Sequence, residues 1–193
     1  MTTFHEPIAH HIGFSVFDAD VTAARYTEML GAKFKLQPIY ELEDIYGRPA
    51  KLKVYYGAIA GLAIEIIEPF EGDTPHATFL RDHGEGIQHI GFWVPNVRAA
   101  TADLVGKGAR VEWVYAREGD DAEKAHAAAQ LTPASTVGDV LGAVSERGLS
   151  YVDIKEGGTA IEFLGPYVHD VIYRHGGPLE GLEEWIQAFP PLE

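Results

Sequence analysis

The chain has 193 residues, the length of one ordinary domain or of two small fused modules, and its 46% hydrophobic content is ample for a packed core. It contains no cysteine, which excludes disulfides and thiolate metal sites and favours a cytoplasmic protein. Its formal net charge of −14, without any cluster of Lys or Arg, argues against nucleic acid and against an anionic membrane as partners.

The first predicted strand is HIGFSV, which begins at His11. Before it, MTTFHEPIAH has no basic segment followed by an apolar one, so we expect no signal peptide, and no later apolar run is long enough to cross a membrane. Apolar and small residues alternate in HIGFSV, as in a strand with one packing face. The next segment predicts a helix, with Asp18 or Asp20 as its N-cap and Gly31 at its end. The strand-like segments KFKLQPIY, KLKVYYGAIA and LAIEII follow, which completes a βαβββ unit.

A connector over residues 73–85 leads to a second copy of this unit. We expect the connector histidines, His76 and His83, to lie at the surface. HIGFWV begins at His89 and repeats the first strand, and the helix that follows has Asn96 as its predicted N-cap. RVEWVY, LSYVDIK and TAIEFLG are the strand-like segments of this copy. An internal repeat of this length determines the fold prediction.

The repeat predicts an α+β fold of one structural domain, in which two tandem βαβββ modules form curved mixed sheets around a metal-binding cleft. We place the modules at residues 5–72 and 86–168, with an insertion at about 115–148 in the second module and a C-terminal tail at 169–193. The Ala-rich insertion predicts one or two short helices, which serve either as decoration at an edge or as a flap near the cleft.

Two histidines and two glutamates occupy equivalent positions of the repeat, namely His11, Glu65, His89 and Glu162. Alone, each has an ordinary explanation, because a strand histidine is usually a hydrogen-bonded core residue and a strand glutamate can face solvent at a sheet edge. Together they are more specific, since pseudo-symmetry brings equivalent strand positions face to face and buried carboxylates need a partner. Two imidazoles and two carboxylates suit one divalent metal ion (Zn, Mn, Co, Ni, Fe or Mg) and leave positions open for a substrate.

These residues resemble the vicinal oxygen chelate superfamily, which includes glyoxalase I, extradiol dioxygenases and methylmalonyl-CoA epimerases. The epimerases are the most similar, through HHIGFSV, YTEMLGAKF, AIEFLGP and above all the run from Ile64 to Val94, IEIIEPFEGDTPHATFLRDHGEGIQHIGFWV. The resemblance implies a glyoxalase-like fold, a metal held by the four His and Glu residues, and a small-molecule substrate with two adjacent oxygens. It also implies acid–base catalysis through an enolate, and a homodimer is a further expectation.

The general base is where the sequence departs from the epimerases. They carry a glutamate upstream of the second metal ligand, whereas this chain has Arg48 and Pro49 at the corresponding place. Glu41, Glu43 and Asp44 lie slightly before it and are the candidate bases, if a short insertion moves one of them into position. A solvated acidic turn, or loss of this base, is the alternative.

Basic and aromatic side chains near these strands indicate different substrates. Coenzyme A carries several phosphates, and Arg48, Lys51 and Lys53 are the local basic residues that would meet them. Tyr56 and Trp93 would instead line a cleft for a more apolar or aromatic substrate.

Three functions follow from the sequence as alternatives. The leading prediction is a divalent-metal-dependent isomerase or epimerase, or a lyase, that stabilises the enolate of a carbonyl or acyl-CoA substrate such as methylmalonyl-CoA. The second is an Fe(II) extradiol-type ring-cleaving dioxygenase, against which Glu65 counts because the resemblance gives no ligand there in that class. The third is a non-enzymatic drug-binding or resistance protein of the same fold, which suits the negative charge but generally lacks the full quartet.

Overall fold

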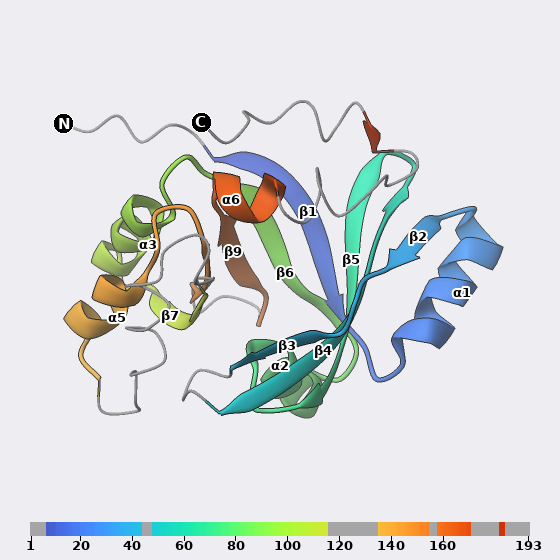
Figure 1. Ribbon diagram of the computed structural model, residues 1–193, viewed down its shortest axis with the longest axis horizontal. Helices are drawn as coiled ribbons and strands as arrows, with labels where there is room; N and C mark the ends of the chain where they lie inside the picture. Colours follow the sequence, from blue (N-terminus) through green and yellow to red (C-terminus); the bar gives the residue numbers. More distant parts are fainter. Residues whose placement is uncertain (1–6, 44–47, 116–134, 155–157, 171–181, 184–193) are drawn as a thin grey trace.

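The computed structural model describes residues 7–43, 48–115, 135–154, 158–170 and 182–183. Within them the chain has an α+β fold, in which one curved nine-stranded sheet is covered by short helices (Figure 1). This confirms the predicted fold class. No helix in the described ranges is long and apolar enough to cross a membrane.

The order of elements follows the predicted repeat. The first half and the connection contain β1 (Ile8–Ser15), α1 (Ala19–Leu30), β2 (Lys33–Leu36), β3 (Tyr40–Glu43), β4 (Pro49–Ile59), β5 (Leu62–Glu71) and α2 (Pro75–His83). The second half contains β6 (Gly86–Trp93), α3 (Val97–Gly106), β7 (Arg110–Tyr115), α5 (Val137–Ala143), β8 (Leu149–Asp153), β9 (Ala160–Leu164) and α6 (Pro166–His169). Strand β3 is an addition, because the sequence did not predict a second short strand beside β2; both pair with β4.

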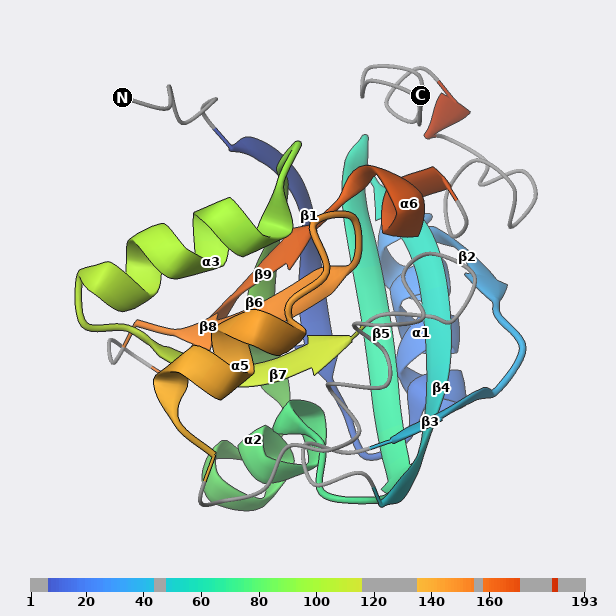
Figure 2. The same cartoon turned by 60° about the vertical axis from the view of Figure 1, so that its left-hand side comes forward.

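The strands repeat one order on either side of a central pair. The sheet runs β2-β4-β5-β1-β6-β9-β8-β7, and β3 lies off this path on β4. β1 is parallel to β5 and β6 is parallel to β9, whereas β1 and β6 run antiparallel to each other. Figure 2 shows β1 and β6 between the two wings of the sheet, which are β2, β3, β4 and β5 on one side and β7, β8 and β9 on the other. Equivalent residues near the centre are therefore related by an approximate twofold axis.

The helices that follow β1 and β6 begin where the sequence predicts. Asp18 is the N-cap of α1 and accepts a hydrogen bond from the backbone N–H of Val21, and Gly31 ends the helix in the left-handed conformation with φ of 66°. Asn96 caps α3 in the same way, through the backbone N–H of Ala99. Both repeats therefore use a short polar side chain to satisfy the first free N–H groups of the helix.

Strand alternation separates the packing face of the sheet from the face that carries the site. Ile64 and Ile66 of β5 are buried in a cluster with Ala23 of α1. Glu65 and Ile67 alternate with them and project from the other face. The helix α1 therefore covers one face of the first wing, while the opposite face is left to line the cleft.

Parts of two predicted segments lie outside the described residues. These parts are residues 116–134 of the insertion and residues 171–181 and 184–193 of the tail. Within the insertion, α5 begins at a capping box in which the Thr136 side chain and the Asp139 carboxylate bond each other's backbone N–H groups. A short helix in this region is thus confirmed, and its role as decoration or flap stays a prediction.

Candidate metal centre

The central strand pair interlocks the two histidines of the repeat. In the antiparallel register His11 lies opposite Gly91, and Gly13 lies opposite His89. A Cβ atom at Gly13 would come within 1.8 Å of the His89 ring, and one at Gly91 within 2.4 Å of the His11 ring. The glycine of each HIG triplet is therefore needed to make room for the imidazole of the other copy.

The parallel pairings bring the glutamates to the same place. Glu65 lies beside Gly13 in the β1–β5 register, and Glu162 lies beside Gly91 in the β6–β9 register. One nitrogen or oxygen from each of the four residues lies within 4.8 Å of the others. All four side chains are buried, with at most 6% of each residue exposed. The structure thus brings together the quartet that the repeat singled out.

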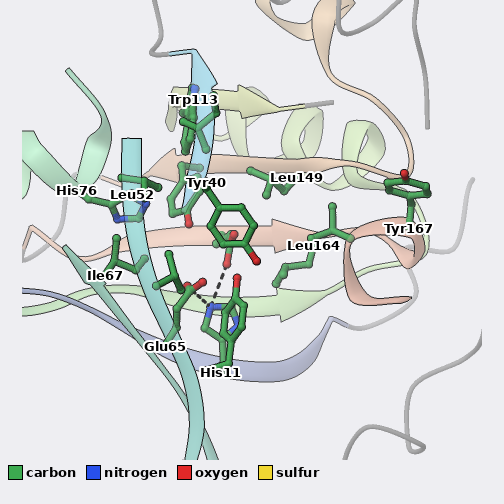
Figure 3. A pocket seen from close by; sticks show the side chains of 16 residues that line it. His11, Tyr40, Leu52, Glu65, Ile67, His76, Trp113, Leu149, Leu164 and Tyr167 are labelled. Carbon is green, nitrogen blue, oxygen red and sulfur yellow. Dashed lines mark ion pairs between the residues drawn. The ribbon is translucent and has the colours of Figure 1, made fainter. Parts of the chain in front are cut away.

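The four polar groups face one another at short range. The Nε2 atoms of His11 and His89 are 2.8 Å apart. The Oε2 atom of Glu65 lies 3.2 Å from the His11 Nε2 and 3.1 Å from the His89 Nε2, and that of Glu162 lies 3.1 Å and 3.5 Å from them. Neither Oε2 atom has a hydrogen-bond partner of normal geometry in the described part of the chain. Figure 3 shows the carboxylate of Glu65 directed toward His11.

The electrostatics of the quartet require positive charge. Burial opposes an imidazolium at His11, but the carboxylates of Glu162 and Glu65 outweigh this and raise the pKa of His11 to about 10. Burial would likewise raise the pKa of Glu65, yet His11 and His89 hold it well below its usual range. Two buried carboxylates in one small space are stable only beside a proton or a cation.

Each quartet histidine is hydrogen-bonded at Nδ1 by the residue that precedes it. The Nδ1 atom of His89 lies 2.7 Å from the Oε1 of Gln88. An amide oxygen only accepts, so the His89 Nδ1 carries the proton and the Nε2 lone pair points into the quartet. The Nδ1 atom of His11 lies 2.8 Å from that of His10, whose Nε2 lies 2.8 Å from the Nδ1 of buried His169 in α6.

The donor set and its surroundings fit a divalent metal ion. Two imidazole nitrogens and two carboxylate oxygens are ordinary ligands of such an ion, and the charges of the two carboxylates match its charge. The Oε2 atoms of Glu65 and Glu162, which are buried without a hydrogen bond of normal geometry in the described part of the chain, supply the observation that favours a cation. The outer hydrogen bonds of His89 with Gln88 and of His11 with His10 are of the kind that orient metal-ligating histidines.

A pocket opens above the quartet (Figure 3). Apart from His11, Glu65 and Glu162, its described lining is mainly aromatic and aliphatic: Tyr40, Leu42, Leu52, Val54, Tyr56, Ile67, His76, Trp113, Leu149, Tyr151, Leu164, Tyr167 and Val168. Both wings of the sheet contribute, with β3, β4 and β5 on one side and β7, β8 and β9 on the other. Tyr56 therefore lies where the sequence predicts a substrate-binding residue.

The other predicted site residues lie elsewhere. Glu41 and Glu43 are exposed and alternate along β3 with Tyr40 and Leu42, which line the pocket. The two carboxylates are thus on the wrong face of the strand to act as the base in this pocket. Asp44, the remaining candidate base, lies outside the described residues.

The predicted substrate-binding residues Arg48 and Trp93 are also absent from the described pocket lining. Arg48 is exposed and forms an ion pair with Asp73 at 3.6 Å. Trp93 is buried at the end of β6, beyond the quartet histidine of that strand.

His76 is the residue whose prediction was wrong. It was expected at the surface, but it is 1% exposed, in a helix that has Thr74 as its N-cap and begins at Pro75. Its ring lies 5.7 Å from that of His89 and 5.3 Å from that of Tyr151, measured between centroids. Burial, with a smaller contribution from His89, lowers the pKa of His76 to about 3, so its imidazole is neutral. His83, as predicted, is exposed.

The signal for His76 was present in the sequence. Thr-Pro is a frequent helix start, and His76 and Leu80 are then four residues apart on one helix face. Gln88 and His10 could also have been found, because both precede a quartet histidine at equivalent positions of the repeat. His169 could not, since nothing local connects it to β1.

Sequence comparison places this chain in a known family. A model of the family described as Glyoxalase/Bleomycin resistance protein/Dioxygenase superfamily matches residues 10–127, more than half of the chain. The chain belongs to this superfamily, which confirms the resemblance drawn from its motifs. A curated relative, the uncharacterized protein YqjC of Bacillus subtilis (strain 168), is 32% identical over 82 residues. The match covers 42% of this chain and 54% of the relative, so it spans about half of that protein's length.

Solved structures of similar fold include methylmalonyl-CoA epimerases. The enzyme from Mycobacterium tuberculosis has a TM-score of 0.50 and 24% identity, over 82% of this chain and 87% of that one. A Streptomyces coelicolor methylmalonyl-CoA epimerase in complex with 2-nitronate-propionyl-CoA has a TM-score of 0.47 and 22% identity, over 81% and 94% of the respective chains. At such identity the likeness to the first structure establishes the shared fold, and the activity has to be argued from the site.

Proposed function

We propose that this chain is a divalent-metal-dependent isomerase or epimerase, or a lyase, acting on a small carbonyl compound with two adjacent oxygens. The observation that carries the proposal is the buried quartet of His11, Glu65, His89 and Glu162, whose ligand atoms converge within 4.8 Å at the base of a pocket. Membership of the superfamily supports it, because many members are enzymes that bind a divalent metal.

The quartet would hold one ion, with Zn, Mn, Co, Ni, Fe and Mg all compatible with nitrogen and oxygen ligands. When bound, such an ion supplies Lewis acidity, which stabilises the negative charge of an enolate formed on the substrate. The surrounding side chains exclude water and hold the carbonyl group near the quartet. Acyl-CoA thioesters such as methylmalonyl-CoA are the substrates that the resemblance to the epimerases implies.

Proton transfer needs an exchangeable group inside the pocket. Outside the quartet, the described lining residues that can exchange a proton at carbon are His76 and the tyrosines at 40, 56, 151 and 167. These groups replace Glu41 and Glu43 as the candidates, because the carboxylates point away from the pocket. Among them Tyr151 and His76 contact the ring of His89, with centroid distances of 5.2 Å and 5.7 Å.

Elemental analysis of the purified protein, before and after dialysis against a chelator, tests the metal. We expect about one equivalent of a divalent ion that rebinds after removal, and a strong loss in Glu65→Ala. Exchange of the substrate α-proton in D₂O, followed by NMR, then tests the reaction. Absence of any metal in both samples, with none taken up on addition, would contradict the proposal and favour the drug-binding alternative.

A ring-cleaving dioxygenase is the second candidate, since the pocket walls are rich in aromatic side chains that would pack on a catechol. Against it, Glu65 is one of the four quartet residues and would give four protein ligands instead of three. Oxygen consumption with catechol and Fe(II)-loaded protein decides between the two. Uptake of one O₂ per catechol would replace the isomerase proposal.

A further inference from the structure

We infer that the substrate is a neutral, largely aromatic or aliphatic carbonyl compound and not an acyl-CoA thioester. This inference rests on the proposed function, because it names the substrate class of the same site. It depends on three features of the chain: the composition of the pocket walls, the faces on which the nearby lysines lie, and the charge balance at the pocket base.

The walls of the pocket are apolar, and the polar groups on them are uncharged. Trp113 and Tyr151 are buried and lie beside His76, with a ring-centroid distance of 5.8 Å between the two aromatics. The lining contains no Lys or Arg among the residues that the structure describes. A phosphate or carboxylate drawn into these walls would lose its water without gaining a cation, which costs several kcal/mol.

The two lysines of β4, Lys51 and Lys53, face away from the pocket. Leu52 and Val54 of β4 line the pocket, so Lys51 and Lys53, which alternate with them, lie on the opposite face of the strand. There each lysine is already paired. The Nζ of Lys51 lies 3.1 Å from Glu71, and that of Lys53 lies 3.0 Å from Asp20 and 3.4 Å from Glu68. The side chains that the sequence offered for CoA phosphates are therefore committed elsewhere.

Arg147 is a cation beside the wall in the described part of the chain. Its guanidinium carbon lies 5.9 Å from the ring centroid of Tyr167, a lining residue. One guanidinium does not match the several phosphates of coenzyme A. The net charge of −14 further opposes a polyanionic substrate at long range.

The pocket base leaves no charge for a substrate to neutralise. The carboxylates of Glu65 and Glu162 together offset the charge of one divalent ion. A loaded site is therefore close to electroneutral, and it favours a neutral ligand over an anion or a cation. The aromatic walls then add affinity through the area that they bury.

Binding to the metal-loaded protein compares three probes by calorimetry and tryptophan fluorescence: benzoin, methylmalonyl-CoA and tetraphenylphosphonium. Benzoin is a neutral α-hydroxyketone with two adjacent oxygens and an exchangeable α-proton. We expect it to bind at least about tenfold more tightly than either charged probe. Tighter binding of methylmalonyl-CoA or of tetraphenylphosphonium would overturn the inference, and so would failure of benzoin to bind.

The α-proton exchange of each bound probe separates this inference from the proposed function. Benzoin that binds but does not exchange its α-proton would leave the substrate class standing and remove the isomerase activity. Faster α-proton exchange with methylmalonyl-CoA than with benzoin would support the isomerase activity and contradict the proposed substrate class.

Two variants locate the binding. Trp113→Ala removes a wall residue and is expected to weaken benzoin about tenfold or more. The Lys51→Ala/Lys53→Ala double variant alters the outer face of the same sheet and is expected to leave benzoin binding unchanged. If the double variant instead abolishes binding of methylmalonyl-CoA that the wild type binds tightly, the lysines serve coenzyme A and the inference is wrong.

Discussion

The two halves of the molecule support their quartet histidines with different chemistry on the same backbone geometry. In the second half the Gln88 amide oxygen accepts a hydrogen bond from the His89 Nδ1, a role that no change of tautomer can reverse. In the first half the equivalent position is His10, an imidazole that accepts or donates according to its own tautomer. The tautomer of His10 depends in turn on His169, so the first half ties its ligand to α6 and the second half does not.

The difference teaches that the repeat fixes where a supporting group stands but not which group it is. Equivalent positions before His11 and His89 both reach an Nδ1 atom at 2.7–2.8 Å. Burial, with His11 as the next cause, keeps the pKa of His10 well below its usual range, so this support is a neutral imidazole. The two halves therefore contribute the same residue types to the quartet but different hydrogen-bond partners to its histidines.

Removal of a quartet glutamate should have the largest effect on metal affinity, and this effect should be the same in both halves. Glu65→Ala and Glu162→Ala each remove one carboxylate from the quartet, and we expect each to reduce metal affinity by more than about 100-fold. Metal titration by calorimetry checks this, and the rise in Tm that metal gives the wild type should vanish in both variants. A loss confined to one of the two would show that the quartet does not act as a symmetric unit.

The next effect concerns the interlocked glycines. Gly13→Ala and Gly91→Ala each add a Cβ that collides with the imidazole of the other half, and we expect a loss of about 3 kcal/mol in the free energy of unfolding. Gly13→Ala should be the worse, because its Cβ would approach the ring more closely. Urea unfolding of the chelated proteins measures both, with Gly106→Ala as control, since nothing lies within 4 Å of that position.

The support residues should matter less than the ligands. Gln88→Ala and His10→Ala remove one outer hydrogen bond each, and a reduction in metal affinity of about 10- to 100-fold is expected. His10→Gln places an amide where the second half has one, and it should retain affinity within about threefold of wild type. Equal losses in His10→Ala and His10→Gln would mean that packing, and not the hydrogen bond to His11, sets the affinity.

Removal of His169 should have the smallest effect on metal affinity, and it concerns the first half alone. His169→Ala breaks the hydrogen bond to His10 and should lower metal affinity by less than about tenfold. In the His10→Gln background the same change should have no effect on metal affinity, because the link to α6 is already gone. A double-mutant cycle on metal affinity measures this coupling. Additive effects of the two changes would contradict the proposed link.

Much of this site was predictable because it is repeated. Alternation in HIGFSV and HIGFWV, with a glutamate in each AIE segment, placed the quartet residues on one face, and the sheet register brought them together. The candidate bases were not predictable in the same way. The sequence predicted no strand over Tyr40–Glu43, so it gave no face on which the side chains of Glu41 and Glu43 would lie. His76 was misplaced because a short connector was not recognised as a buried helix.

The interlock of glycine and histidine across β1 and β6 also has a consequence for the order of folding. His11 and His89 are 78 residues apart in the chain, and each half supplies only one of the two quartet imidazoles. Closing so long a loop is slow, so the metal has no finished site to bind until the two wings have docked. In a stopped-flow refolding experiment, metal should therefore leave the early folding phase unchanged and act only after docking, by slowing the reverse step.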